Sequence, residues 1–105
     1  MNVVERQLKA YNEKNIDAFM ECYSEDIQVY KFPNTLRFSK KEEMREHYDK
    51  MFQAFPNLNA DVVKRVEQAP YCIDHEYITG KEKEPFHATA LYEIKDDIIT
   101  KVWFL

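Results

Sequence analysis

Three histidines and one lysine in this sequence have the chemistry of a general base or acid. His47 falls in a helical pattern, whereas His75 and His87 fall on two strands joined by a short connection. Histidine titrates near neutral pH, so each is a candidate catalytic group, although a solvated or core histidine is the simpler interpretation of His47. Lys31 ends the first strand and would act as a base only if burial lowered its pKa by several units.

The two strand histidines also raise the question of a metal site. Asp74 and Glu76 flank His75 and add carboxylates, which are common metal ligands. Side chains alternate along a strand, however, so both carboxylates face away from His75. The sequence therefore predicts no metal site. It leaves two alternative pairs of a general base and an orienting group, His75 with Tyr77 or His87 with Thr89.

Composition excludes several classes of protein. The chain has 105 residues and a single glycine, Gly80, so it lacks the glycine-rich motifs that bind dinucleotides or phosphates or form a nucleophile elbow. A net charge of −4 argues against a nucleic-acid-binding protein. No apolar run is long enough to span a membrane. We therefore expect no cofactor and neither a nucleic-acid nor a membrane partner.

The two cysteines and the first residues bear on where the protein resides. Cys22 and Cys72 match no metal-ligand or redox spacing, which indicates buried thiols in a reducing compartment. The sequence begins without a basic segment followed by an apolar core, so it predicts no secretory signal. We expect a cytoplasmic protein.

Aromatic side chains make up 14% of the chain, with seven phenylalanines, seven tyrosines and one tryptophan. The simpler interpretation is a core of large residues. The alternative is a cavity for a small apolar or aromatic molecule, because aromatic walls with a few polar groups are typical of such sites. The segments that turn toward the first helix predict these pocket residues: Tyr11, Phe19, Tyr30, Tyr48, Phe52, Ala90 and Tyr92.

Two helices and a strand are predicted at the start of the chain. Val4, Leu8 and Tyr11 have the spacing of one apolar helix face. Asn15 can cap a second, short helix, because its side chain can accept a hydrogen bond from an N–H group two or three residues on. Apolar residues then alternate from Ile27, which indicates a strand.

A short strand at 35–38 is followed by a long helix at 39–54. Ser39 and Glu42 have the spacing of a capping box. The apolar stripe of this helix predicts that it packs across a sheet and buries three side chains: Met51, Phe52 and Phe55.

Period-two patterns at 58–68, 71–79, 86–94 and 98–105 predict four more strands. Their short connections favour antiparallel hairpins. The predicted order is α-α-β-β-α-β-β-β-β, an α+β fold in which a curved antiparallel sheet wraps around helices. We expect residues 1–105 to form a single domain.

Three stretches carry a family resemblance: YNEKNIDAFMECYSEDIQVY at 11–30, FSKKEEMREHY at 38–48 and YEIKDDIITKVW at 92–103. They resemble the nuclear transport factor 2-like superfamily, which includes SnoaL-like polyketide cyclases and steroid delta-isomerases. The resemblance covers nearly the whole chain and implies a cone-shaped sheet with a ligand in its mouth. It bears on the fold more than on the activity, because one fold hosts many functions.

The resemblance also bears on whether this chain can catalyse the steroid isomerase reaction. Steroid delta-isomerases use a carboxylate base and an oxyanion hole made by a tyrosine and a protonated aspartic acid. The tyrosine position falls on Gln7, the base on Lys31 and the second acid near Ala90, while Tyr48 matches a tyrosine of the family's third helix. Because none of the first three residue types is retained, we expect no steroid isomerase activity.

Three functions remain open. The first is a small-molecule binding protein with an apolar, aromatic pocket. The second is a SnoaL-like enzyme of isomerase, cyclase, dehydratase or hydrolase type, which uses acid–base chemistry on a cyclic or polyketide-like substrate. The third is a dimerisation or partner-binding module. A pocket with two titratable groups would favour the enzyme, and a dry apolar pocket would favour the binding protein.

The sheet face that the helices leave uncovered needs other cover if it is apolar. The resemblance implies sheet-to-sheet pairing, so we expect a symmetric homodimer. The candidate residues for the paired face are Val62 or Val63, Ile78, Ile99 and Trp103.

Overall fold

A computed structural model describes residues 2–105, and this part of the chain has the predicted α+β order. The helices are α1 (Val3–Glu13), α2 (Ile16–Met20) and α3 (Lys41–Ala54). The strands are β1 (Tyr23–Lys31), β2 (Thr35–Phe38), β3 (Asn59–Gln68), β4 (Tyr71–Thr79), β5 (Phe86–Lys95) and β6 (Ile98–Phe104). No helix of residues 2–105 is long and apolar enough to cross a membrane.

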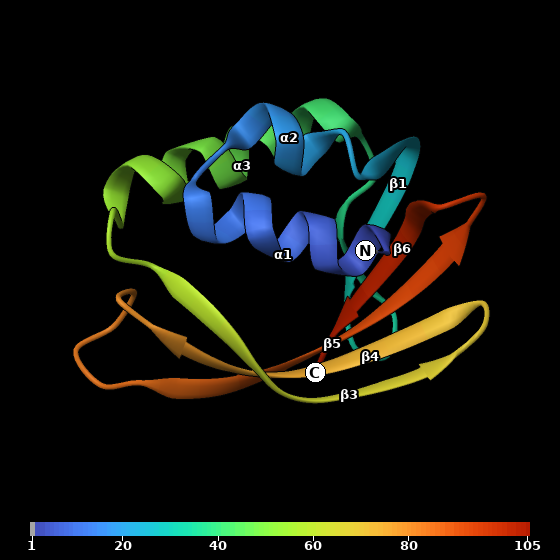
Figure 1. The fold of residues 1–105 in the computed structure, drawn as a ribbon. Helices are drawn as coiled ribbons and strands as arrows, with labels where there is room; N and C mark the ends of the chain where they lie inside the picture. The colour runs from blue at the N-terminus through green and yellow to red at the C-terminus, as the bar shows by residue number, and fades with distance from the viewer. Residues whose placement is uncertain (1) are drawn as a thin grey trace.

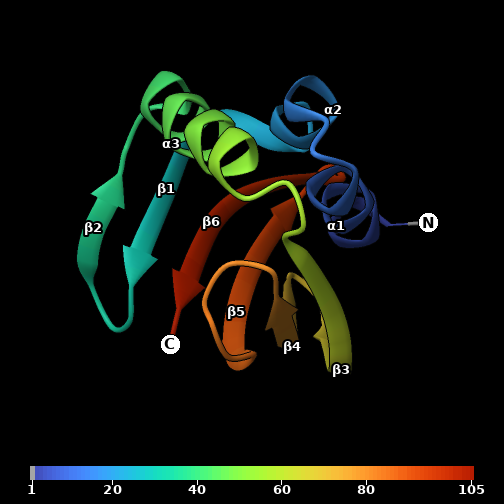
Figure 2. The ribbon, with the colours of Figure 1, turned by 90° about the vertical axis from the view of Figure 1, so that its left-hand side faces the viewer.

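The six strands form one curved sheet in the order β2-β1-β6-β5-β4-β3. The short connections give antiparallel pairs, as predicted, from β3 through β6 and between β1 and β2. The pair β1–β6 is parallel and joins the first long strand to the last. All three helices lie over the concave face, which leaves the other face without a helix (Figures 1 and 2).

The helix starts confirm one predicted cap and correct another. Asn15 precedes α2, and its side chain accepts a hydrogen bond from the Ala18 N–H at 3.1 Å, as predicted. The capping box at Ser39 is wrong, because α3 begins at Lys41 with Lys40 at the cap and no side-chain cap bond. Ser39 instead lies in the bend that connects the end of β2 to the helix.

The long helix packs on the sheet through the predicted stripe. Met51 and Phe52 are buried, together with Tyr48 one turn earlier and Met44 two turns earlier. Phe55 is only partly buried, because it lies at the C-cap, where the chain leaves the helix. Burial of this stripe against the inner face of the sheet is what fixes the position of α3.

Alternation on β4 places Asp74 and Glu76 on the inner face and His75 and Tyr77 on the outer face. The inner face is therefore the one that carries two carboxylates. Most of the buried apolar side chains of the other strands face the same way and pack under the helices.

The outer face carries an apolar row that crosses all six strands. Each member is register-paired with the next, so the row runs from one edge of the sheet to the other. The side chains range from half-buried to about half exposed. From β3 to β2 the row consists of Val66, Ile73, Leu91, Trp103, Tyr30 and Leu36.

This row replaces most of the residues that were predicted for the outer face. Ile78 and Ile99 are wrong, because both point inward and are buried. Val62 pairs with the inward-facing Glu76 and shares its face. Val63, in the irregular part of β3, is exposed, and Trp103 lies in the row.

Candidate functional site

A cavity of about 160 Å³ lies between the helices and the inner face of the sheet. All three helices and four of the strands contribute to its lining. Seven of its fifteen lining residues are phenylalanines or tyrosines: Tyr11, Phe19, Tyr23, Tyr48, Phe86, Tyr92 and Phe104. Two polar groups deep in the fold, Gln7 and Glu76, also line it.

Glu76 is the carboxylate of this cavity. Its position on β4 turns it inward, and its side chain is only 8% exposed. No described residue donates a hydrogen bond to it. Burial, followed by the nearby charge of Asp74, raises the pKa of Glu76 to about 7, with Arg65 opposing the shift. At neutral pH the group is therefore present in both the acid and the base form, as a proton-transfer catalyst requires.

Asp74, two residues earlier on the same face, shows the opposite arrangement. It is fully buried, and Arg65 binds it with Nε at 2.6 Å from Oδ1 and Nη2 at 2.9 Å from Oδ2. Arg65 also lies 3.7 Å from a carboxylate oxygen of Glu5. The hydrogen bond that Arg65 donates to Asp74 raises the pKa of Arg65 further above its usual range. Asp74 is thus part of a buried ion pair and is not free for chemistry.

A buried hydrogen-bond chain crosses the cavity wall. The Tyr23 hydroxyl donates to Oε1 of Gln7 at 2.9 Å, and Nε2 of Gln7 donates to the Tyr92 hydroxyl at 3.3 Å. Burial raises the pKa of both tyrosines well above the usual value, so both stay protonated donors. Because the Tyr92 oxygen accepts from Gln7, its own proton is available to a ligand.

Two further phenols line the cavity. Burial raises the pKa of Tyr48 to about 12 and raises that of Tyr11 further. Neither hydroxyl is hydrogen-bonded to a described residue. The cavity therefore combines one titratable carboxylate with neutral hydroxyl donors on an otherwise apolar wall.

Four of the seven predicted pocket residues line this cavity: Tyr11, Phe19, Tyr48 and Tyr92. Phe52 lies behind the wall and packs edge-on against Tyr11, with ring centroids 5.4 Å apart. Ala90 is fully buried opposite Asp74 and is not part of the lining. The role of the four lining residues in ligand binding stays a prediction.

The placement of Tyr30 in the pocket is wrong. It follows the inward-facing Val29, so alternation turns it to the outer face, where its ring stacks on Trp103 at 5.8 Å. Residues on the same strand cannot all face the helices, and the aromatic type of Tyr30 gave no indication of its direction.

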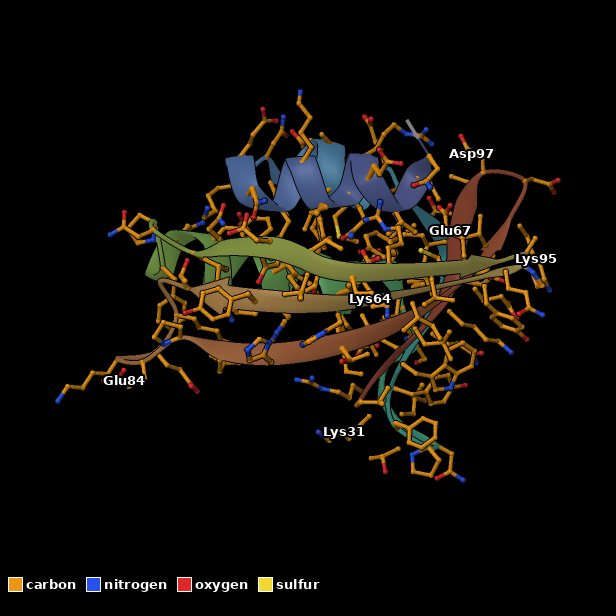
Figure 3. The ribbon with its side chains drawn as sticks, turned by 60° about the horizontal axis from the view of Figure 1, so that its bottom comes forward. Lys31, Lys64, Glu67, Glu84, Lys95 and Asp97 are labelled. Atoms are coloured by element: carbon orange, nitrogen blue, oxygen red, sulfur yellow. The ribbon has the colours of Figure 1, made fainter. Side chains whose placement is uncertain are left out.

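The four predicted catalytic candidates are not brought together. His47 lines the cavity at its exposed side, where burial, then Arg37 and Lys81, lower its pKa. His75 and His87 face outward, with Nε2 of one 2.9 Å from Nδ1 of the other. Lys31 is exposed at the projecting end of β1 (Figure 3).

Glu76 is the functional group that the sequence reasoning missed. Alternation correctly turned it away from His75, but that direction leads into the cavity and not to solvent. The sequence did contain a signal for this residue, because the strand face opposite His75 carries two acids, Asp74 and Glu76. Among residues 2–105, no group of three or more histidines, cysteines or acids could hold a metal ion.

Comparison with solved structures shows the same fold at low sequence identity. A cystatin-fold protein of Novosphingobium aromaticivorans superposes with a TM-score of 0.90 at 20% identity, over 98% of this chain and 94% of that one. A protein of Sinorhizobium meliloti that is described as a polyketide cyclase superposes with a TM-score of 0.84 at 16% identity, over 98% of this chain and 93% of that one. An epoxide hydrolase of M. tuberculosis gives 0.81 at 12%, over 97% and 77%. These likenesses establish the fold alone.

Sequence comparison gives the family. A search of curated proteins finds no match. The family model described as the SnoaL-like domain matches residues 4–102, nearly the whole chain. Together with the nuclear transport factor 2-like and ketosteroid isomerase-like folds of similar structures, this match confirms the predicted resemblance. The chain belongs to the SnoaL-like domain family.

Proposed function

We propose that this protein is a cofactor-independent enzyme that moves a proton on a small organic substrate held in the cavity. The observation that carries the proposal is Glu76, a buried carboxylate in the cavity wall whose pKa is raised to about 7. A general base works best when its pKa lies near the working pH. The descriptions of similar structures as a polyketide cyclase and an epoxide hydrolase support chemistry on small organic molecules.

The groups around the cavity fit abstraction of a proton from carbon next to a carbonyl. The Glu76 carboxylate takes the proton, the C–H electrons form the enolate, and the negative charge moves to the carbonyl oxygen. The Tyr92 hydroxyl is the donor for that oxygen, because Gln7 already holds its oxygen as an acceptor. The chain from Tyr23 through Gln7 polarises this donor. Where the substrate has a carbon–carbon double bond conjugated with the enolate, return of the proton from Glu76 to the far carbon of that double bond completes an isomerisation.

A binding protein without turnover is the second candidate. The apolar part of the wall, which includes Phe19, Met51, Phe86 and Phe104, favours it, because such surface suits a ligand that is held and not changed. The two candidates differ in whether Glu76 acts on the bound molecule.

A proton-exchange assay separates the two candidates. Cyclohexanone in deuterated water, followed by NMR, reports the exchange of its α-protons. We expect the wild-type protein to accelerate exchange, with a rate that rises as pH increases through about 7. Glu76→Gln should abolish the acceleration, while Glu84→Gln, at an exposed acid of the β4–β5 connection, should keep it (Figure 3). Equal rates with wild type and Glu76→Gln would favour the binding protein.

We infer that the outer face of the sheet mediates a symmetric homodimer. The apolar row supports this, because its six side chains form a continuous stripe that no helix covers. Light scattering at micromolar concentration should give twice the chain mass. Ile73→Lys, in the middle of the row, should shift the mass to that of a monomer, and a monomeric wild type would contradict the proposal.

We also propose that the protein resides in the cytoplasm. Cys22 and Cys72 are both free and buried, which fits a compartment where thiols stay reduced. Cell fractionation with an antibody against the chain tests this, and recovery in a secreted fraction would contradict it.

A further inference from the structure

The exposed side of the cavity is flanked by two basic side chains from separate elements. Lys81, at the start of the β4–β5 connection, lines the cavity directly. Arg37, on β2, lies with its guanidinium carbon 5.7 Å from the centroid of the Phe38 ring. Phe38 in turn packs against His47, with ring centroids 5.0 Å apart, and His47 lines the same side of the cavity as Lys81.

Neither cation is neutralised by the protein. Lys81 and Arg37 form no ion pair with a described residue. Glu82 and Glu84 follow Lys81 in the same connection, but both are exposed and unpaired with it. After burial, Arg37 and Lys81 both lower the pKa of His47, which places both basic groups near this side of the cavity, although the whole chain carries a net charge of −4.

The size of the cavity limits what lies behind this entrance. Its volume is about 160 Å³. A cavity of about 150 Å³ holds one benzene molecule, whereas sites for drug-sized ligands are about 300–1,000 Å³. The enclosed part of the cavity therefore has room for a single ring or a short chain, and a larger molecule would extend through the exposed side.

We propose that the substrate is a small anionic carbonyl compound, with its reacting carbons beside Glu76 and its oxyanion group at the entrance between Arg37 and Lys81. The inference rests on the proposed function, because it places the reacting end at Glu76. A planar carboxylate and a phosphate monoester share the required chemistry, and arginine can bind either with two parallel hydrogen bonds. The positive entrance also draws an anionic substrate toward the cavity.

Matched one-ring probes test the charge preference. Benzoate, phenyl phosphate, benzamide and benzylamine have the same ring and carry anionic, anionic, neutral and cationic groups. NMR or calorimetric titration at a pH of about 6, where Glu76 is mostly protonated, compares their affinities. We expect an anionic probe to bind about fivefold more tightly than benzamide, with a preference that salt weakens. The tighter of the two anions identifies the oxyanion class.

Variants locate the preference at the entrance. Arg37→Gln with Lys81→Gln should reduce the affinity for the anion to that for benzamide and leave benzamide binding unchanged. Lys83→Gln, at an exposed lysine of the same connection, is the control and should change neither the affinity for the anion nor the affinity for benzamide. Melting temperatures of the variants verify folding. Tightest binding of benzylamine, equal binding of anion and benzamide, a preference that survives the double substitution, or no binding of any probe would overturn the inference.

The result is separable from that of the proposed function. Glu76→Gln removes the base and leaves the entrance intact, so it should bind benzoate at least as tightly as wild type while it loses proton exchange. Loss of the anion preference with intact exchange would overturn only the substrate class. An intact preference without exchange would overturn only the reaction.

Discussion

The two faces of β4 carry different titratable groups, and their environments reverse what the residue types suggest. His75 and Tyr77 face outward beside His87, in contact with solvent. Asp74 and Glu76 face inward, where burial raises the pKa of Glu76 to about 7. The residue that we propose for proton transfer is thus a glutamate and not a histidine. Its raised pKa follows from desolvation and not from its side-chain type.

A second contrast lies within the inner face itself. Asp74 and Glu76 share a strand and a direction, but Arg65 satisfies only Asp74. Asp74 therefore has a cationic partner, whereas Glu76 has no hydrogen-bond donor among the described residues and burial raises its pKa. The ion pair with Arg65 is therefore what distinguishes Asp74 from Glu76 on this face.

The largest expected effect separates the packed side of the sheet from the open side. Phe52→Ala should lower the free energy of unfolding by about 4 kcal/mol, because it removes a buried ring and leaves a cavity. Val63→Ala, at an exposed position of β3 outside the row, should cost about 1 kcal/mol or less. Urea denaturation measures both, and a cost for Phe52→Ala under about 1 kcal/mol would show that the α3 stripe is not core.

Removal of Arg65 tests the contrast between the two carboxylates. Arg65→Met should cost about 3 kcal/mol, since it leaves the charge of Asp74 buried without a partner. Glu5→Gln, at the more distant and half-exposed partner of Arg65, should cost about 0.5 kcal/mol or less. Equal effects of the two substitutions in urea denaturation would show that Asp74 is not the residue that Arg65 stabilises.

The pH dependence of stability tests Glu76. Its folded-state pKa of about 7 lies above the value of about 4.3 for an unfolded glutamate, so the folded state binds more protons between these pH values. Stability therefore falls as pH rises through this window. As pH rises from about 4.5 to about 8, the free energy of unfolding of Glu76→Gln should increase by about 2–3 kcal/mol relative to that of wild type. A difference in the free energy of unfolding between the two proteins that stays the same at every pH would refute the raised pKa of Glu76.

The smallest expected effect is the absence of steroid isomerisation. The resemblance to the isomerases puts Lys31 at the position of their base, but Lys31 is an exposed lysine and not an inward-facing carboxylate. The enclosed part of the cavity, about 160 Å³, is close in size to one that holds a single benzene ring. Purified protein should convert a β,γ-unsaturated ketosteroid no faster than buffer. Turnover by the unmodified chain, followed by absorbance of the conjugated product, would contradict this account.

The fold was largely predictable because its signals are local. The bounds of β2 and β4, the cap at Asn15 and the order of elements all follow from short patterns. The parallel pairing of β1 with β6 was not predicted, because it joins segments about seventy residues apart whose patterns do not specify each other.

The site was less predictable because alternation gives relative and not absolute directions. On β4, the face with Tyr71, Ile73 and Tyr77 is the more apolar, yet it is the outer one. The buried face carries Asp74 and Glu76, so hydrophobicity alone favours the wrong side of this strand. Only the helices, which cover the inner face, decide the direction and turn Glu76 into the cavity.

The most direct test of the central claim is the pKa of Glu76 in the folded protein. Carbon-13 labelling of glutamate carboxyl groups, with Glu76→Gln to assign the resonance, allows its titration to be followed by NMR. The account predicts a midpoint near 7, set by burial and the charge of Asp74. A midpoint near the ordinary value of about 4.3 would contradict it, because Glu76 would then be a solvated carboxylate with no special capacity for proton transfer.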